Sequence, residues 1–198
     1  MNKVTMNIIV YATLILISVN CGSKGGADLS PEPTRKVMKN IPDWYLNTPV
    51  NEGFRYEAAV ATSQDLQLSV NKATVDAASR LAATIESEME GYTKRIQEET
   101  GLEGSSELLD RYSQTQGQVI AISLRDYKVV KKEILEEKSK PRDIFRSYIL
   151  IEWDEGAANK RLLDRLKADK EIYDAIRESE LIDEMEEKVA KYRERKGN

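Results

Sequence analysis

The residue with the most specific chemistry in this sequence is Cys21, the only cysteine among 198 residues. It follows an almost wholly apolar stretch, residues 6–19, and Lys3 lies upstream of that stretch. About 14 apolar residues are too few for a membrane span, which needs about 20, but they suit a secretory signal. A cysteine directly after such a signal is the acylation site of bacterial lipoproteins. The pattern therefore predicts a signal peptide over residues 1–20 and a lipid, such as palmitate, on Cys21.

The residues before Cys21 differ from the usual lipobox, which has Leu at position −3 and a small residue at position −1. Ser18 and Asn20 occupy these positions. Two alternatives therefore stay open: an uncleaved signal anchor, and a plain signal followed by an incidental cysteine. Gly22 is not the Asp that retains some lipoproteins at the inner membrane, so the outer membrane is favoured, with the domain facing the periplasm. Two or three acyl chains would hold the protein there firmly.

The residue types that are missing argue against an enzyme. The sequence contains no histidine, which excludes His-containing triads and His-ligated metals. With its single cysteine acylated, the chain has no disulfide, thiolate zinc site or cysteine nucleophile. Phosphate-binding, dinucleotide-binding, hydrolase and calcium-loop motifs are also missing. We therefore expect no catalytic residues, no cofactor and no metal.

The charged residues predict wet helix faces. Asp, Glu, Lys and Arg make up 32% of the chain, and the formal net charge is −4. A mildly acidic protein lacks the basic surface that nucleic acids require, so no nucleic-acid partner is expected. Acid pairs such as Glu86 with Glu90, and Glu136 with Glu137, are interpreted as solvated.

The elements that follow Cys21 predict an α+β fold. Residues 21–40 are rich in Gly, Pro and polar residues and predict a flexible tether. Residues 54–62 alternate as a half-buried strand does, and a long alanine-rich helix follows to about residue 100, capped by Thr62 or Ser63. A helix begins at Ser105 or Ser106 and passes Tyr112. Two strands then form a hairpin over residues 126–135 and 144–153, with Val119, Ile120 and Ile122 leading into the first strand. The prediction is a small antiparallel sheet of about three strands packed by the long helix.

The domain organisation places a domain over residues 41–154 and a C-terminal amphipathic helix over residues 155–198. That helix starts at Asp154 or Asn159 and is charged and nearly 40 residues long. It carries an apolar seam that either packs along the first long helix or binds another copy or an envelope protein. The seam consists of Leu162, Leu166, Tyr173, Ile176, Ile182, Met185, Val189 and Tyr192. Asp169 and Glu180 interrupt its repeat.

Two tryptophans are candidates for docking or packing. Trp44 lies between Pro42 and Pro49 and either anchors the tether to the domain or stacks on a ligand. Trp153 continues an apolar strand face with Phe145, Ile149 and Ile151, so a core position is favoured over a ligand platform.

The order of these features resembles the LPP-twenty lipoprotein family, whose domain also occurs in flagellar accessory proteins. The resemblance rests on Pro42-Asp43-Trp44, the helix segment ATVDAASRLA from Ala73, the segment VIAISLRDYKVVK from Val119, and the strand YILIEW from Tyr148. It covers residues 41–154, and it implies a small outer-membrane lipoprotein, sometimes assembling around the flagellar motor. It implies no catalytic residues. The long C-terminal helix and the irregular lipobox depart from the family pattern.

Together these observations predict a non-enzymatic outer-membrane lipoprotein, anchored to the membrane by its lipid, that acts as a structural or assembly component. Its expected partners are further copies of itself or another envelope protein, bound through the long helices. The alternative is a periplasmic binding module for a small ligand or cell-wall fragment, with Trp44 beside the pocket.

Overall fold

The computed structural model describes residues 40–101, 106–138 and 142–197. From Asn40 onward the chain forms one compact unit. Its elements, in chain order, are α2 (Asp43–Leu46), β1 (Phe54–Ser63), α3 (Leu66–Thr100), α4 (Ser106–Ser123), the 3₁₀ turn η2 (Leu124–Asp126), β2 (Lys128–Glu137), β3 (Ile144–Asp154), α5 (Glu155–Ala168), α6 (Lys170–Ile176) and α7 (Glu180–Lys196). Residues 1–20, Cys21 and the tether up to residue 39 lie outside the described residues, so the predictions about them stay predictions.

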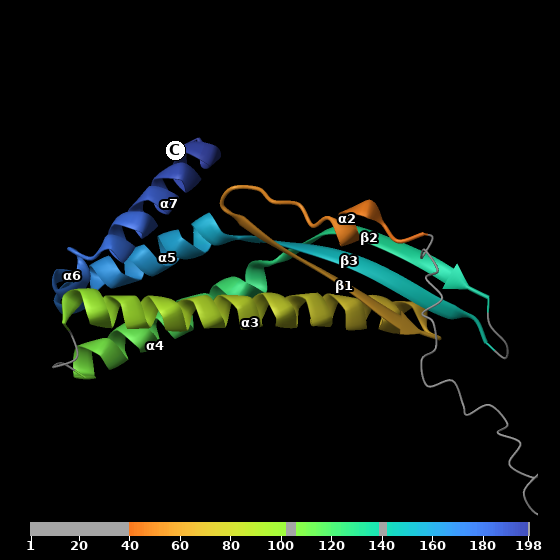
Figure 1. The fold of residues 1–198 in the computed structure, drawn as a ribbon, viewed down its shortest axis with the longest axis horizontal. Helices are drawn as coiled ribbons and strands as arrows, with labels where there is room; N and C mark the ends of the chain where they lie inside the picture. The colour runs from red at the N-terminus through yellow and green to blue at the C-terminus, as the bar shows by residue number, and fades with distance from the viewer. Residues whose placement is uncertain (1–39, 102–105, 139–141, 198) are drawn as a thin grey trace, which may run out of the picture. The chain divides into compact units, whose positions relative to one another are not determined.

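The strands form one antiparallel sheet in the order β1-β3-β2, so β3 is the central strand (Figure 1). The register of β1 on β3 is regular, beginning with Phe54 opposite Asp154. The register of β2 on β3 shifts by a bulge between Val129 and Lys131. The predicted fold class, an α+β fold with a three-stranded antiparallel sheet packed by a long alanine-rich helix, is confirmed.

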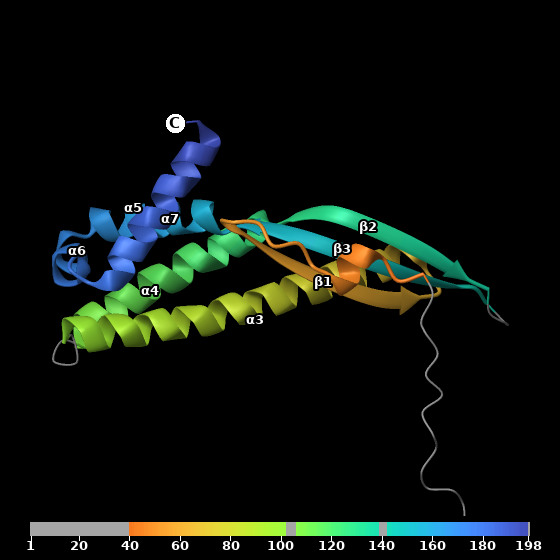
Figure 2. The same ribbon diagram turned by 45° about the horizontal axis from the view of Figure 1, so that its top comes forward.

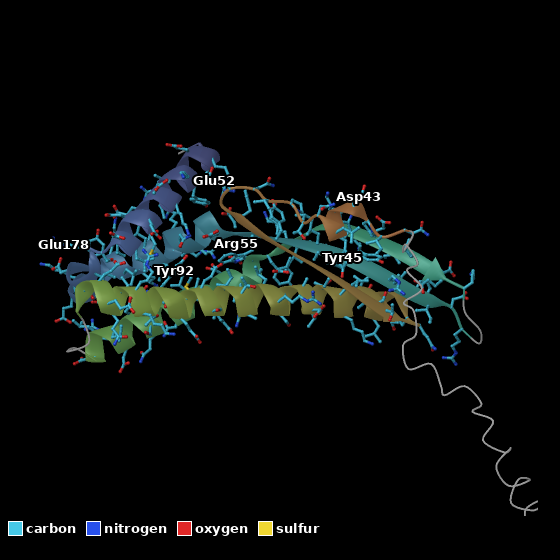
Figure 3. The ribbon with its side chains drawn as sticks, in the orientation of Figure 1. Asp43, Tyr45, Glu52, Arg55, Tyr92 and Glu178 are labelled. Carbon is cyan, nitrogen blue, oxygen red and sulfur yellow. The ribbon has the colours of Figure 1, made fainter. Side chains whose placement is uncertain are left out.

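The central strand β3 is buried on both faces over its middle, from Ser147 to Ile151. Ile149, Ile151 and Trp153 lie in the core that includes α3. Tyr148 and Leu150 point to the opposite face and are just as buried. The short helix α2, which carries Tyr45, lies over that second face (Figure 3). The ring of Tyr45 meets the ring of Tyr148 edge-on, with 5.0 Å between the ring centres. When both faces of a strand are covered, its sequence is a continuous run of apolar residues and not an alternation of apolar and polar ones.

The long helix α3 contributes to two separate cores. Its first half lies on β1 and β3 through Ala73, Ala77, Leu81 and Ile85, and the two alanines allow the backbone to approach the sheet closely. Its second half extends past the sheet and runs beside the other helices (Figure 2). There Ile96 belongs to a core built by α4, α5, α6 and α7. None of the described helices is both long and apolar enough to cross a bilayer.

Two predicted boundaries around α3 and α4 are wrong. The cap of α3 is Asp65, whose side chain accepts a 2.6 Å hydrogen bond from the backbone N–H of Leu68, not Thr62 or Ser63. Val119, Ile120 and Ile122 lie in α4, not at the entry to a strand. Their β-branched side chains favour a strand, but tertiary packing overrides that preference. The buried positions of α4 have helical spacing and are Tyr112, Gln116, Val119, Ile120 and Ser123.

The predicted single C-terminal helix is wrong in its continuity, because the segment forms α5, α6 and α7 instead. Asp169 separates the first two helices and caps α6, since its side chain accepts a hydrogen bond from the N–H of Ile172. Ser179 occupies the N-cap position of α7. Polar residues that interrupt a helical repeat favour caps and turns, and here they allow the chain to fold back on itself.

Candidate functional site

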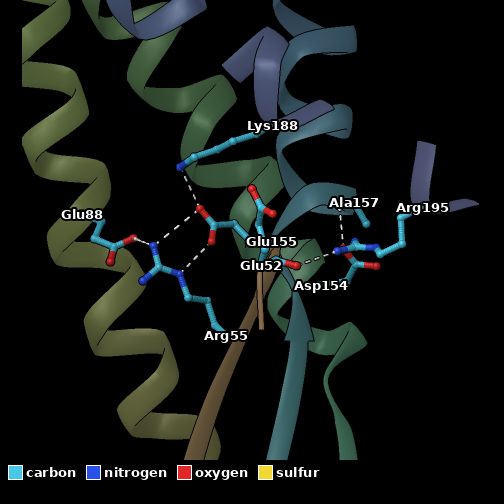
Figure 4. A network of polar contacts seen from close by, with 8 residues as sticks. All are labelled: Glu52, Arg55, Glu88, Asp154, Glu155, Ala157, Lys188 and Arg195. Carbon is cyan, nitrogen blue, oxygen red and sulfur yellow. Dashed lines mark hydrogen bonds and ion pairs between the residues drawn. The ribbon is translucent and has the colours of Figure 1, made fainter. Parts of the chain in front are cut away.

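The end of the sheet where β1 begins and β3 ends carries a cluster of charged side chains from four elements (Figure 4). Glu155, the first residue of α5, accepts 2.8 Å hydrogen bonds from Arg55 Nε of β1 and from Lys188 Nζ of α7. Arg55 also contacts Glu88 of α3 at 3.0 Å. The side chain of Glu155 is only 15% exposed, so this carboxylate joins the sheet to α3, α5 and α7 from a largely buried position.

Burial alone would raise the pKa of Glu155, because a low-polarity environment disfavours the charged carboxylate. The hydrogen bond and charge of Lys188, together with the charge of Arg55, outweigh burial, so the pKa lies below its ordinary value of 4.5. Glu155 is therefore ionised at neutral pH. A carboxylate held charged by two cations is suited to linking elements and unsuited to donating a proton.

The last turns of α7 are fixed against the same end of the sheet by a stripe of cations. Arg195 donates to Asp154 Oδ1 at 2.6 Å and to the carbonyl oxygen of Glu52 at 3.1 Å. Its guanidinium also lies 4.0 Å from the ring centre of Phe54. Lys191 pairs with Glu52 at 2.9 Å. These contacts are spaced along one face of α7, and they hold its C-terminal end beside the start of β1.

Two glycines make this close approach possible. A Cβ added to Gly156 would lie 2.8 Å from the Cβ of Tyr192 on α7. Gly53 has φ +76°, and a Cβ added there would collide with the guanidinium of Arg195. A side chain at Gly156 would push α7 away from α5, because the Cβ and ring of Tyr192 lie in its way. At Gly53 the end of the Arg195 side chain would have to move, and the positive φ favours glycine.

A cleft of about 850 Å³ lies between α7, α5 and the start of β1. Among its lining residues, Arg55, Lys188, Lys191 and Arg195 each pair with a carboxylate of this chain. Within the described ranges, no group of His, Cys, Asp and Glu side chains is arranged to hold a metal ion. Because these cations are paired with carboxylates of the same chain, we interpret the residues that line the cleft as the contacts that fix α7. We do not interpret the cleft as a ligand site.

The two candidate tryptophans lie in different environments. Trp153 is buried and its indole N–H donates to the carbonyl oxygen of Ser123 at 2.7 Å, which confirms the predicted core position. Trp44 is half-buried on α2, with its ring edge-on to Tyr45 at 6.5 Å. Tyr45, which the sequence analysis did not single out, makes the ring contact to the sheet. The possible stacking of Trp44 on a ligand stays a prediction.

The predicted partner seam is covered by the chain itself. Six of its eight residues are buried in the helical core: Leu162, Leu166, Ile176, Ile182, Met185 and Val189. Tyr173 and Tyr192 are half-buried. The breaks at Asp169 and Ser179 turn the apolar faces of α5, α6 and α7 toward one another and toward α3 and α4. Of the two predicted alternatives, the structure shows internal packing, which includes α3, and the buried seam is not available to a partner helix.

An accessible apolar surface occurs instead on the strand β2. Every side chain of β2 except that of Leu135 is exposed, including Val129 at 45%, Val130 at 41% and Ile134 at 37%. β3 is the one described element against which β2 packs extensively. β1, the other edge strand, is half-buried along most of its length because α3 lies on it. We call the free side of β2, Lys128–Glu137, the β2 edge.

The sequence carries a signal for the β2 edge that was not used. KVVKKEILEE has charged residues at positions facing both sides of the sheet, whereas the middle of β3, YILI from Tyr148 to Ile151, is apolar on both sides. That difference identifies β3 as central and β2 as an edge strand.

The fold is thus a three-stranded antiparallel sheet with a helical layer, an α+β domain in which β2 is the more exposed of the two edge strands. No family model, no curated protein and no solved structure matches this chain. The resemblance to the LPP-twenty lipoproteins therefore stays a prediction.

Proposed function

We propose that this chain is a non-enzymatic lipoprotein of the outer membrane, held by a lipid on Cys21, that serves as a structural or assembly component of the cell envelope. Its domain binds protein through the β2 edge. This replaces the long-helix seam as the binding surface, because the seam residues are buried within the domain.

The observation that carries this proposal is the exposed β2 edge. An edge strand presents a row of backbone N–H and C=O groups that another strand can pair with. Ten residues, Lys128–Glu137, offer this row, and the exposed Val129, Val130 and Ile134 add apolar area. Ten residues lie at the upper end of the usual length of a strand, so the edge is long enough for specific strand addition.

The anchor rests on the sequence pattern that ends at Cys21. Two or more acyl chains hold a protein stably on a membrane, which restricts the domain to partners near that surface. Tethering also raises the effective concentration of such partners, so a moderate affinity at the β2 edge suffices.

The anchor and the edge are tested separately on the full-length chain expressed in a bacterium with two membranes. Mass spectrometry of the mature N-terminus should find a diacylglyceryl group on Cys21 in the wild type and none in Cys21→Ser. An unprocessed N-terminus in the wild type contradicts the anchor.

For the edge, a photo-crosslinking residue replaces Val129 of β2. The matched control replaces Val75, a valine of α3 that is 63% exposed. Crosslinks to protein should form from position 129 and be at least several-fold weaker from position 75. Equal or absent crosslinking from the two positions would contradict binding through the β2 edge.

A further inference from the structure

The charges of β2 are divided between its two ends. Its first half carries Lys128, Lys131 and Lys132, and its second half carries Glu133, Glu136 and Glu137. In an antiparallel pair the start of one strand lies beside the end of the other. An antiparallel pair of two β2 strands therefore brings the basic half of each copy to the acidic half of its neighbour, which no uniformly charged strand would do.

The face on which each side chain lies limits how two β2 strands can pair. After the bulge, Lys132 and Ile134 lie on the α3 face, opposite Ile149 and Ser147 of β3. Lys131 lies on the other face, opposite Leu150. Side chains directly opposite each other in a sheet point to the same face. The two-fold axis that relates the strands must therefore lie midway between one residue and the same residue of the other copy. We name the axis after that residue.

An axis at Ile134 matches four of the five charged positions after the bulge and leaves only Glu133 opposite an apolar residue, Leu135. It puts Ile134 opposite Ile134, Lys132 opposite Glu136, and Lys131 opposite Glu137, with each charged pair occurring twice. Neighbouring axes oppose like charges: Lys132 lies opposite itself, Glu133 lies opposite itself, or Glu133 lies opposite Glu137. Like charges directly opposite each other are unfavourable. The axis at Lys132 also pairs Lys131 with Glu133 twice, but the axis at Ile134 gives the most opposite-charge pairs after the bulge and no like-charge pair, so the charge pattern favours that register.

We infer that the partner at the β2 edge is a second copy of this chain, paired antiparallel through β2 about a two-fold axis at Ile134. This inference rests on the proposed function and names its partner. The two three-stranded sheets then join into one sheet with the order β1-β3-β2-β2-β3-β1. The axis is perpendicular to the sheet, so α2 lies on the same face in both copies. This arrangement is compatible with anchoring both copies in one membrane.

The register is tested first with one cysteine introduced into β2 of the full-length chain in membranes, where the proposed lipid on Cys21 blocks the thiol of that residue. Residues opposite each other in an antiparallel pair have Cα atoms about 4.5–5.5 Å apart, within the range that a disulfide bridges. Ile134→Cys should therefore form a disulfide-linked dimer on mild oxidation. Lys131→Cys is the matched control, because its own copy would lie roughly 20 Å away along the strand. Mixing Lys131→Cys with Glu137→Cys should restore crosslinking.

The charges are tested by exchange. Lys132→Glu alone and Glu136→Lys alone should each raise the dissociation constant of the dimer about ten-fold or more, because each creates two like-charge pairs. The double variant should return it to near the wild-type value. Sedimentation of the detergent-solubilised chain measures the constant, and thermal melting checks that the exposed substitutions leave the fold intact.

The outcomes separate this inference from the proposed function. If the wild-type chain is a monomer and the variant with the crosslinking residue at position 129 crosslinks to a different protein, self-pairing is overturned and the β2 edge stays a binding surface. A monomer without crosslinks at position 129 overturns both. A dimer that the charge exchange does not affect, or that crosslinks equally through Lys131→Cys and Ile134→Cys, overturns the register and with it the inference.

Discussion

The sheet half of the domain (β1, β2, β3 and the first half of α3) and the helical half (the rest of α3 with α4 to α7) use the same long helix in different ways. In the sheet half, α3 contributes small side chains such as Ala73 and Ala77, and it covers β1 and β3 but leaves β2 open. In the helical half, the large apolar side chains of five helices enclose one another. Ion pairs such as Arg95 with Glu184 and Arg111 with Asp169 surround that core.

The difference shows which half leaves a surface open to a binding partner. The helical half buries its own apolar stripe, so its charged exterior is a solvated surface. The sheet half ends in a strand that packs on one side alone. The helical half, whose apolar residues are covered, therefore contributes mainly to stability. The sheet half, with an exposed edge strand, can bind a further strand. The following changes test this contrast, from the largest expected effect to the smallest.

Truncating the helical core should have the largest effect. Leu166 is fully buried among α5, α6, α7 and their neighbours. Leu166→Ala should lower the free energy of unfolding by about 3 kcal/mol, because it removes buried apolar area and leaves a cavity. Urea denaturation followed by circular dichroism measures this change. Val75→Ala on the exposed surface of α3 is the control and should change it by less than about 0.5 kcal/mol. Equal effects at the two positions would contradict a closed helical core.

Separating α7 from α5 should have a smaller effect. Gly156→Ala adds a Cβ where only 2.8 Å separates it from the Cβ of Tyr192. We expect a loss of about 2 kcal/mol, as for other overpacked sites. The matched control is Gly91→Ala in α3, where no atom lies within 4 Å of an added Cβ. That change should instead stabilise the protein by about 0.5–1 kcal/mol, because alanine is the better helix former. Two changes of the same sign would show that the contact of α7 is loose.

The charged cluster at the junction should make stability depend on acid pH. The pKa of Glu155 is lower in the folded protein than its ordinary value of 4.5. Folding therefore favours the ionised form, so the stabilisation is fully present above about pH 4.5 and is lost as the pH falls through the folded pKa. Glu155→Gln should cost about 1.5 kcal/mol at pH 7 and much less at pH 3, because hydrogen bonds to charged groups are the stronger ones. Stability curves at both pH values measure the difference. If Glu155→Gln lowers the free energy of unfolding equally at both pH values, Glu155 is not ionised in the charged cluster.

The hydroxyl pair between α3 and β3 should have the smallest effect and should be asymmetric. The buried oxygens of Ser69 and Ser147 lie 2.7 Å apart, and Ser69 also donates to the carbonyl oxygen of Leu66 at 2.8 Å. Ser147 must then donate to Ser69. Ser69→Ala leaves the Ser147 hydroxyl without its acceptor and should cost about 1 kcal/mol, whereas Ser147→Ala should cost less. Thermal melting of the two single variants and the double variant tests the order. The reverse order would reverse the assigned direction of the bond.

The elements that repeat regularly were predictable from the sequence. The apolar stripe of α3 and the alternation of β1 follow from side-chain periodicity, and both are present at almost the predicted bounds. The helix α4 was missed beyond Tyr112, because Val119, Ile120 and Ile122 prefer strands by local propensity. They are helical here because two of them pack into the cores.

The site was less predictable than the fold, because it depends on which surfaces the chain covers itself. The periodicity of the seam from Leu162 to Tyr192 is real, but spacing alone does not say whether the covering helix is internal or belongs to a partner. Asp169 and Ser179 contained the answer, since both occupy N-cap positions and mark reversals of the chain. The contacts of Glu155 with Arg55 join residues 100 positions apart, and no local pattern indicates them.

The continuous helix α3 has a consequence for how the domain comes apart. Ile85 lies in the sheet core and Ile96 in the helical core, and the helix between them is unbroken. Loss of either core would expose half of the apolar stripe of α3 and so destabilise the helix on which the other core also packs. Partial unfolding of one half is therefore unfavourable. The domain should therefore open as a single cooperative unit, and backbone amides in the middle of α3 should exchange with solvent only through global unfolding.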